Sequence, residues 1–396
     1  MLPWPLSSGG HQGIFNSLKA VSQFCDIHLV YYAGQKDTAA CYHDELKKQL
    51  GGNVTIHPYV DNPMKWDRSV AFRKIANKIF KRMDLFDYIL FTKLHDNAYY
   101  DFVNSIIEQY NIDLVQVEMA ECMDFVLTLP TSVKRLFVHH EIRYVRNERF
   151  LDQFGRSLRN VALYEQEKIK ETALLNRYDT VITVSEKDKE LLIESGVTTP
   201  VHASFLVVNT PVSGTVASAP GSHHLVYVGP EAHYPNKVGL EWFLDKVWPL
   251  VKEKDGCFTM DIIGNWSKNT AKEWAKRYPD VHFMGFVDDL AIAMQGATMV
   301  VPIFVGSGIR MKILEAMSLG IPFVSTTVGA EGIPVQNGIH GFISDSPEDF
   351  ANQVMNAENA DVRERLVRNA YDLVKNKYSH EVLTKDRIFV YKTLLG

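Results

Sequence analysis

The sequence predicts an α/β protein built from two doubly wound domains with parallel sheets. Three observations support this fold class. Apolar, strand-like runs alternate with helical stretches along the chain. Several runs are apolar almost throughout, as are parallel strands that helices cover on both faces. The segments between them are long enough for crossover helices, and strand–helix alternation is typical of parallel sheets.

The expected strands fall into two sets. Those of the first half are 26–32, 88–94, 113–118, 135–140 and 180–185. Those of the second half are 224–229, 259–264, 281–286, 297–303 and 322–327. Residues 236–254 predict a crossover helix, because apolar residues recur there at spacings of three or four. Residues 378–395 predict a final helix.

A segment with almost no large apolar residue separates the two sets of strands. It reads NTPVSGTVASAPGSHH and covers 209–224, a composition typical of a linker. We therefore expect an N-terminal domain over 1–208, a linker over 209–224 and a C-terminal domain over 225–377, with the helix of 378–396 after it. Two such domains that face each other place a ligand between the carboxyl ends of their sheets.

Composition excludes several classes of function. The net charge of −5 over 396 residues argues against nucleic acid as the main partner. The four cysteines form no CxxC pair, which indicates reduced thiols rather than disulfides or a zinc site. No apolar run approaches the length of a bilayer span, and the start lacks the features of a signal peptide. A cytoplasmic protein is therefore expected.

The start of the chain is unusual for a doubly wound domain. The Gly-rich loop PWPLSSGGHQG, residues 3–13, would normally follow a first strand, yet only two residues precede it. Either the first strand is very short, or the natural start of the protein is missing.

The stretch GSGIRMKILEAMSLG, residues 306–320, contains the residues that we expect to bind a ligand. It predicts a Gly-rich turn followed by a helix whose first residues include Arg310 and Lys312. Cations destabilise a helix N-terminus, whereas a bound phosphate there would offset the penalty and would also accept hydrogen bonds from the first N–H groups. Glu315 lies beside the apolar stripe and can point toward a ligand. The alternative is a surface turn in which Lys312 and Glu315 form an ion pair.

This segment resembles the C-terminal signature of the GT-B glycosyltransferases, in particular of the large retaining family 4. One branch of that family reads GSGIRxKILEAMAxGxPVVSTxxGAEGL, which residues 306–333 follow closely. Residues 183–192, 227–251 and 281–290 are also similar to that branch, whereas the N-terminal half matches weakly.

The resemblance implies a GT-B fold of two facing Rossmann-like domains. It further implies transfer of a sugar, with retention, from a nucleotide-sugar to a saccharide or lipid-linked saccharide, in cell-surface polysaccharide synthesis. No cofactor is expected, and a UDP- or GDP-sugar would be the donor substrate. The alternatives are a nucleotide-sugar epimerase of the same fold and a non-catalytic nucleotide-sugar-binding protein.

The resemblance also assigns residues of the donor site. Glu315 matches the second glutamate of the E-x7-E motif, which binds the donor's ribose, but Ser307 stands where the first glutamate is usual. That departure puts the carboxylate contact to the transferred sugar in doubt. Pro230 likewise stands where the family often has an arginine, so Arg310 and Lys312 are expected to supply the charge for the diphosphate. The donor-binding residues that we expect are Gly9, Gly10, Gly229, Asn236, Ser307, Gly308, Arg310, Lys312 and Glu315.

Two adjacent histidines end an expected strand, where relatives place a histidine beside the transferred sugar. The pair His140–Glu141 best matches the family's HD or HN pair, and His139 is the alternative. Only one of the two should face the ligand, because side chains alternate along a strand. With Glu315, they complete the expected catalytic set. Arg143 and Arg146 face either an anionic acceptor or solvent.

No metal site is expected. The sequence holds no DxD triplet, which a metal-dependent GT-A transferase would need.

Residues 67–86 predict a basic amphipathic helix, which either contacts an anionic membrane peripherally or packs on the core with a solvated basic face.

Overall fold

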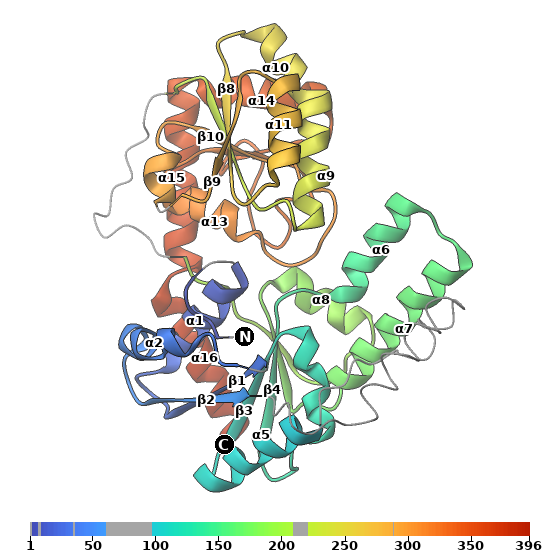
Figure 1. Cartoon of the computed structure of the whole chain (residues 1–396), viewed down its shortest axis with the longest axis vertical. Helices are drawn as coiled ribbons and strands as arrows, with labels where there is room; N and C mark the ends of the chain where they lie inside the picture. Colours follow the sequence, from blue (N-terminus) through green and yellow to red (C-terminus); the bar gives the residue numbers. More distant parts are fainter. Residues whose placement is uncertain (1, 7–8, 35, 61–96, 209–220, 288) are drawn as a thin grey trace. The chain divides into compact units, whose positions relative to one another are not determined.

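The computed structural model describes residues 2–6, 9–34, 36–60, 97–208, 221–287 and 289–396 (Figure 1). The chain divides into two compact units, Met1–Leu206 with Leu383–Gly396 and Val207–Val382. The predicted helix of 67–86, the predicted strand of 88–94 and most of the predicted linker lie outside the described residues.

Unit 1 begins with a parallel two-stranded sheet. Its strands are β1 (Ile27–Gly34) and β2 (Val54–Val60), and its helices are α1 (Gly9–Val21), η1 (Ala40–Tyr42) and α2 (His43–Leu50). Phe15 of α1, Tyr31 of β1 and Leu46 of α2 are buried together, so the apolar faces of the three elements form one small core.

The second part of unit 1 is a parallel sheet of four strands. The strands run in the order β3 (Leu114–Glu118), β4 (Lys134–His139), β5 (Thr180–Thr183) and β6 (Val201–Ala203). Its helical segments are α5 (Asn97–Tyr110), η2 (Ala120–Leu127), α6 (Arg143–Phe154), α7 (Leu158–Leu175) and α8 (Glu186–Glu194). Figure 1 shows α6 and α7 side by side as an antiparallel pair.

The last helix belongs to unit 1 although it follows unit 2 in sequence. Helix α16 (His380–Leu395) buries Val390 against Leu136 and Val138 of β4 and Ile182 of β5. Tyr391 of the same helix donates a hydrogen bond to the side chain of Gln116 in β3. The end of the chain is thereby fixed to this sheet.

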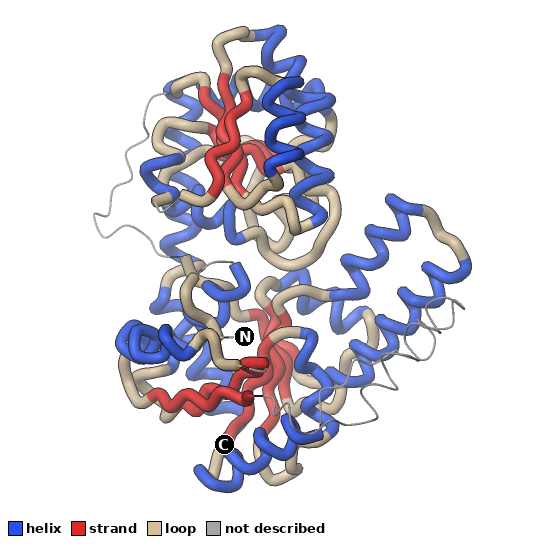
Figure 2. The backbone as a smooth tube through the Cα atoms, in the orientation of Figure 1, coloured by secondary structure: helices blue, strands red, loops and turns tan. Residues whose placement is uncertain are grey.

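Unit 2 is one doubly wound sheet of six parallel strands in the order β12-β11-β10-β7-β8-β9. The strands are β7 (His224–Val228), β8 (Thr259–Ile263), β9 (Val281–Gly285), β10 (Thr298–Val301), β11 (Phe323–Ser325) and β12 (Phe342–Ile343). Helices cover both faces, as Figure 2 shows in blue around the red strands. They are α9 (Tyr234–Trp242), α10 (Trp248–Lys254), α11 (Lys268–Arg277), α12 (Leu290–Ala293), α13 (Met311–Ser318), α14 (Pro347–Glu358) and α15 (Ala360–Lys377).

The predicted crossover helix of 236–254 is not one regular helix. It consists of α9, a π-helical segment η3 (Phe243–Val247) and α10. Pro249 lies in the first turn of α10 and has no N–H to donate to the preceding turn. The wider turns of η3 accommodate this break while Phe243, Leu244 and Val247 stay in the core.

We predict that Gly239→Ala destabilises unit 2, because α9 lies very close to the chain that follows β10. A Cβ on Gly239 would lie 1.9 Å from the carbonyl oxygen of Pro302. The forced separation should lower the free energy of unfolding by about 1–3 kcal/mol, measured by denaturant titration. Gly256→Ala is the control, since a Cβ there meets nothing closer than 4.0 Å. Equal stability of the two variants would contradict this packing.

Candidate functional site

The order of the strands in unit 2 locates a ligand-binding edge. Strand β7 lies between β10 and β8, so the direction of winding reverses between β7 and β10. In open parallel sheets, ligands bind beyond the carboxyl ends of the strands at this reversal. The segments there are the loop that begins at Gly229 after β7 and the turn of 302–310 after β10.

The loop after β7 is tightly packed. Gly229 has a φ of 155°, and a Cβ there would lie 2.6 Å from the side chain of Asn236. Its N–H donates to Ile263, and its carbonyl accepts a hydrogen bond from the indole of Trp266 at 2.9 Å. Glycine is therefore required for the backbone to pass between its neighbours.

The turn after β10 leads directly into helix α13. Gly306 and Gly308 have φ values of 125° and 75°, which favour glycine. Nη1 of Arg310 donates to the carbonyl oxygens of Ser307 and Gly308, each at 2.6 Å, and these bonds hold the turn closed. Arg310 is also the N-cap of α13, yet its side chain makes no capping hydrogen bond to the helix. The start of α13 is thus a compact turn with a guanidinium folded against it.

Lys312, in the first turn of α13, lies in a setting that is unfavourable for an ammonium group. Nζ donates to Oδ1 of Asn236 at 3.1 Å and stands 4.8 Å from the ring centroid of Tyr227. Burial, with the nearby charge of Arg310, lowers the pKa of Lys312 to about 7, and the charge of Glu315 opposes this shift only in part. An anion in front of α13 would favour the charged form.

Lys237, which follows Asn236 near the start of α9, forms an ion pair of its own. Its ammonium lies 3.7 Å from Oε1 of Glu231. Glu231 also accepts hydrogen bonds from the N–H of Ser267 and the hydroxyl of Thr270 at the start of α11. Lys312, not Lys237, is therefore the lysine that bonds to Asn236.

The remaining predicted residues of unit 2 lie on the same helix and turn. Ser307 is buried, with 6% of its surface exposed. Glu315 is half-buried one turn into α13, and its charge acts on Lys312. The structure thus brings Gly229, Asn236, Arg310 and Lys312 to one edge of the sheet.

A second group of predicted residues meets in unit 1. Gly9 and Gly10 are the first residues of α1. One turn further, a Cβ on Gly13 would lie 3.4 Å from Cε1 of His140, so the start of α1 lies against this histidine. Nε2 of His140 is 2.5 Å from Oε2 of Glu118 at the end of β3. The side chains of both residues are 14% exposed, so the pair reaches the surface.

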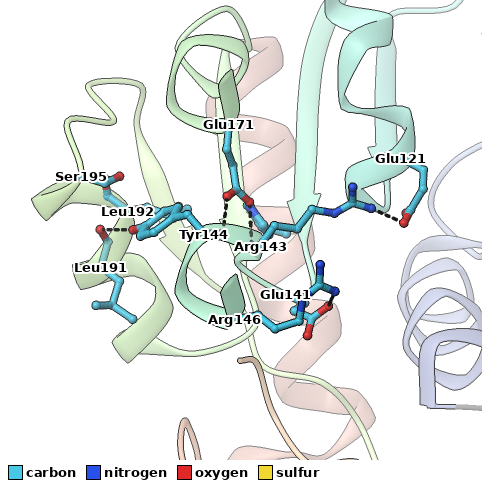
Figure 3. A network of polar contacts seen from close by, with 10 residues as sticks. Glu121, Glu141, Arg143, Tyr144, Arg146, Glu171, Leu191, Leu192 and Ser195 are labelled. Atoms are coloured by element: carbon cyan, nitrogen blue, oxygen red, sulfur yellow. Dashed lines mark hydrogen bonds and ion pairs between the residues drawn. The ribbon is translucent and has the colours of Figure 1, made fainter. Parts of the chain in front are cut away.

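His139, by contrast, is part of the core. Its side chain is 1% exposed, and Nε2 donates to Oε1 of Glu171 at 2.8 Å. Glu171 also accepts the backbone N–H groups of Arg143 and Tyr144, the first residues of α6 (Figure 3). Burial opposes the charge of Glu171, but the bonds from His139 and the two N–H groups outweigh it and lower the pKa of Glu171. Of the two candidate histidines, the structure therefore buries His139 and leaves His140 at the edge.

Arg143 and Arg146, which the sequence predicts to face either an anionic acceptor or solvent, are both paired with carboxylates. Arg143 contacts Glu121, and Nη1 of Arg146 lies 3.0 Å from Oε2 of Glu141 (Figure 3). Their charges are thus balanced within unit 1.

Sequence reasoning missed the carboxylates behind the histidines. Glu118 ends an expected strand, and its position beside the end of the next parallel strand could have identified it. Glu171 has no such signal, because it reaches β4 from a position near the end of α7, 32 residues further along the chain than His139. Within the described part of the chain, no cluster of three or more metal-ligating side chains occurs, and no helix is long and apolar enough to span a membrane.

We predict that Glu171→Ala destabilises the protein by about 3–5 kcal/mol, because it leaves His139 and the start of α6 without their buried partner. The lowered pKa means that this stabilisation is complete above the ordinary pKa of a glutamate and is lost as the pH falls through the folded-state value. Unfolding measured at neutral and at acidic pH should show the difference shrinking with acid. Asp152→Ala, which removes an exposed pair with Arg156, is the control. Equal effects of the two changes would contradict this assignment.

Comparisons with known proteins agree with this architecture. Residues 222–359 match the model of a family described as glycosyl transferases group 1. An uncharacterized 44.6 kDa protein in the cps region of Klebsiella pneumoniae is 26% identical over 166 residues, which is 39% of this chain and 42% of that protein. The match thus spans less than half the length of this curated relative.

Solved glycosyltransferase structures share the fold at low identity. Sucrose-phosphate synthase from Thermosynechococcus elongatus has a TM-score of 0.65 at 15% identity, over 93% of this chain and 98% of that one. HepE of Anabaena, in complex with UDP, has a TM-score of 0.62 at 14% identity, over 93% and 100%. TarM has a TM-score of 0.60 at 13% identity, over 75% of this chain and 58% of TarM. The chain therefore has the GT-B fold, and its residues 222–359 match the group 1 glycosyl transferases.

Proposed function

We propose that the protein is a glycosyltransferase that moves a sugar, with retention, from a nucleoside-diphosphate sugar to a saccharide or lipid-linked saccharide acceptor. Cell-surface polysaccharide synthesis is the proposed setting. The observation that carries the proposal is the pair of cations at the start of α13, beside the strand-order reversal of the unit 2 sheet.

The donor's diphosphate is the anion that fits this edge. The side chain of the N-cap Arg310 accepts no hydrogen bond from the first N–H groups of α13, and a phosphate can accept hydrogen bonds from them. Arg310 and Lys312 add two charges at the same end. Glu315, one turn further, would bind the ribose hydroxyls. Because the leaving diphosphate gains negative charge during transfer, preorganised donors here stabilise the transition state more than the ground state.

The comparisons support a nucleotide-sugar donor. Solved structures of similar fold hold UDP or UDP-glucose in HepE, and UDP in TarM of S. aureus. Because these proteins are only 13–14% identical to this chain, their ligands serve here as probes and do not identify its substrate.

The proposed chemistry uses the leaving group as the base. The bond from the anomeric carbon to the diphosphate oxygen breaks, a bond to the acceptor oxygen forms on the same face, and the acceptor proton passes to the leaving diphosphate. His140 is the proposed contact to the reacting sugar. A product of inverted anomeric configuration would contradict this sequence of steps.

One observation favours a second candidate, a nucleotide-sugar-binding protein without turnover. Ser307 is buried, and it stands where the family usually has the first glutamate of its E-x7-E motif. The side chain at this position therefore offers no carboxylate for a contact with the transferred sugar. Binding of the donor with no release of nucleoside diphosphate, even with acceptors from cell extracts, would support this candidate over the first.

We predict that one class of nucleotide-sugar raises the melting temperature of the protein. A panel of UDP-, GDP-, ADP- and CMP-sugars measured by thermal shift should show the effect, because a ligand well above its Kd stabilises by a few kcal/mol. Arg310→Ala should reduce the shift because it removes a contact to the diphosphate. Glu315→Ala should reduce it because it removes a contact to the ribose hydroxyls.

Arg277→Ala is the matched control for this panel. Arg277 ends α11, where it pairs with Asp245, so its removal should leave the shift intact. Wild-type shifts in both Arg310→Ala and Glu315→Ala would show that residues 306–320 do not bind the donor.

We also predict that donor binding weakens as the pH rises above about 7. The empty site holds Lys312 with a pKa of about 7, whereas the bound diphosphate favours its charged form, so binding takes up a proton. Affinity should fall by up to about tenfold per pH unit above that value. Calorimetry with a nucleotide-sugar, whose own phosphates do not titrate there, measures this slope. Lys312→Arg, always charged, should remove it; an unchanged slope would exclude Lys312 as its source.

A further inference from the structure

A line of hydrogen bonds connects the C-terminal helix to His140. The hydroxyl of Tyr391 in α16 donates to Oε1 of Gln116 at 2.6 Å. Nε2 of Gln116 donates to Oε1 of Glu118 at 2.5 Å. The other oxygen of Glu118 accepts from Nε2 of His140 at 2.5 Å. All four residues lie in unit 1, and two elements, β3 and α16, supply the residues of this line behind the histidine.

The direction of these bonds determines which nitrogen of His140 carries the proton. A carboxylate only accepts hydrogen bonds, so Nε2 must be the protonated nitrogen. In the neutral ring, Nδ1 then presents a lone pair. Among the described residues no hydrogen bond reaches Nδ1, and this edge of the ring faces α1 at Gly13, where a Cβ would lie 3.5 Å from Nδ1.

Glu118 is held in place from behind as well. Gln116 fixes one oxygen, and Arg387 of α16, which is 1% exposed, lies near it. Burial lowers the pKa of Arg387, and the charge of Glu118 is the largest influence that opposes this lowering. The two charges therefore act on each other inside the unit, and Glu118 has little freedom to turn away from His140.

Exposure distinguishes this pair from the neighbouring one. The side chains of His139 and Glu171 are 1% and 2% exposed, as expected for a pair that only stabilises the fold. Those of His140 and Glu118 are each 14% exposed and lie at the carboxyl edge of the sheet, beside the start of α1.

We propose that Glu118 is a positioning residue, which holds His140 so that Nδ1 accepts a hydrogen bond from a hydroxyl of the bound sugar. Gln116 and Tyr391 lock Glu118 in this position. The proposal rests on the function proposed above and specifies the role of His140: it accepts a hydrogen bond from the sugar and does not donate one.

The first test measures the protonated nitrogen directly. Long-range 1H–15N spectra of protein labelled in its histidines show which ring nitrogen carries the proton, and His140→Asn identifies the signals. The wild type should show His140 protonated on Nε2. Glu118→Ala should give a mixture of the two forms, whereas Glu118→Gln, whose amide oxygen still accepts from Nε2, should restore the single form. Glu121→Ala, which removes a neighbouring carboxylate that pairs with Arg143, is the control.

The second test compares UDP-glucose with UDP by calorimetry. Glu118→Ala and His140→Ala should each lower the affinity for UDP-glucose by about three- to tenfold, which is the contribution of one hydrogen bond. The affinity for UDP should stay unchanged. Tyr391→Phe should produce a smaller loss in the same direction, and Glu118→Gln should bind as the wild type does.

The outcomes separate this proposal from the function on which it rests. A His140 protonated on Nδ1, or a single form that persists in Glu118→Ala, overturns the positioning role whether or not any donor binds. Equal weakening of UDP and UDP-glucose overturns it as well. Absence of UDP-glucose and UDP binding in the wild type counts against a UDP-sugar as the donor of the proposed function, and the ring-nitrogen measurement then decides the positioning role alone.

Discussion

The hydrogen bond between Lys312 and Asn236 joins the two segments on which the candidate donor site depends. Lys312 belongs to the helix after β10, and Asn236 to the helix after β7, on the two sides of the reversal in strand order. Asn236 also donates to the carbonyl of Pro230, so it fixes the loop after β7 at the same time. Because Asn236 is a neutral amide, this hydrogen bond does not neutralise the charge of the Lys312 ammonium.

Each unit places its polar side chains at the carboxyl ends of parallel strands, but with different chemistry. In unit 2 these are cations beside a helix start, which suits a diphosphate. In unit 1 they are His140 and Glu118. The carboxylate accepts from Nε2 of the histidine, which leaves Nδ1 as a hydrogen-bond acceptor. The buried pair of His139 and Glu171 shows the contrast, because the same residue types there hold the start of α6 in the core.

The sequence predicted the fold class and most strands, because parallel strands buried on both faces are apolar throughout. The short strands β6 and β12 and the polar β2, which contains Pro58, lack that signal. The segment around Arg310 and Lys312 was recognisable from charge at a helix start. The contact of Tyr391 was not, because 275 residues separate Tyr391 from its partner Gln116. The setting of Lys312 likewise depends on a tertiary contact, because 76 residues separate it from Asn236.

Amide hydrogen exchange with and without UDP tests the central claim most directly, namely that the start of α13 and the loop after β7 hold the diphosphate. Protection is expected in peptides that cover 306–313 and 229–237, because the ligand would accept hydrogen bonds from N–H groups there. Peptides from β3 and α5 of unit 1 serve as the reference and should exchange as before. Protection by UDP that spares both segments and falls elsewhere would contradict the account.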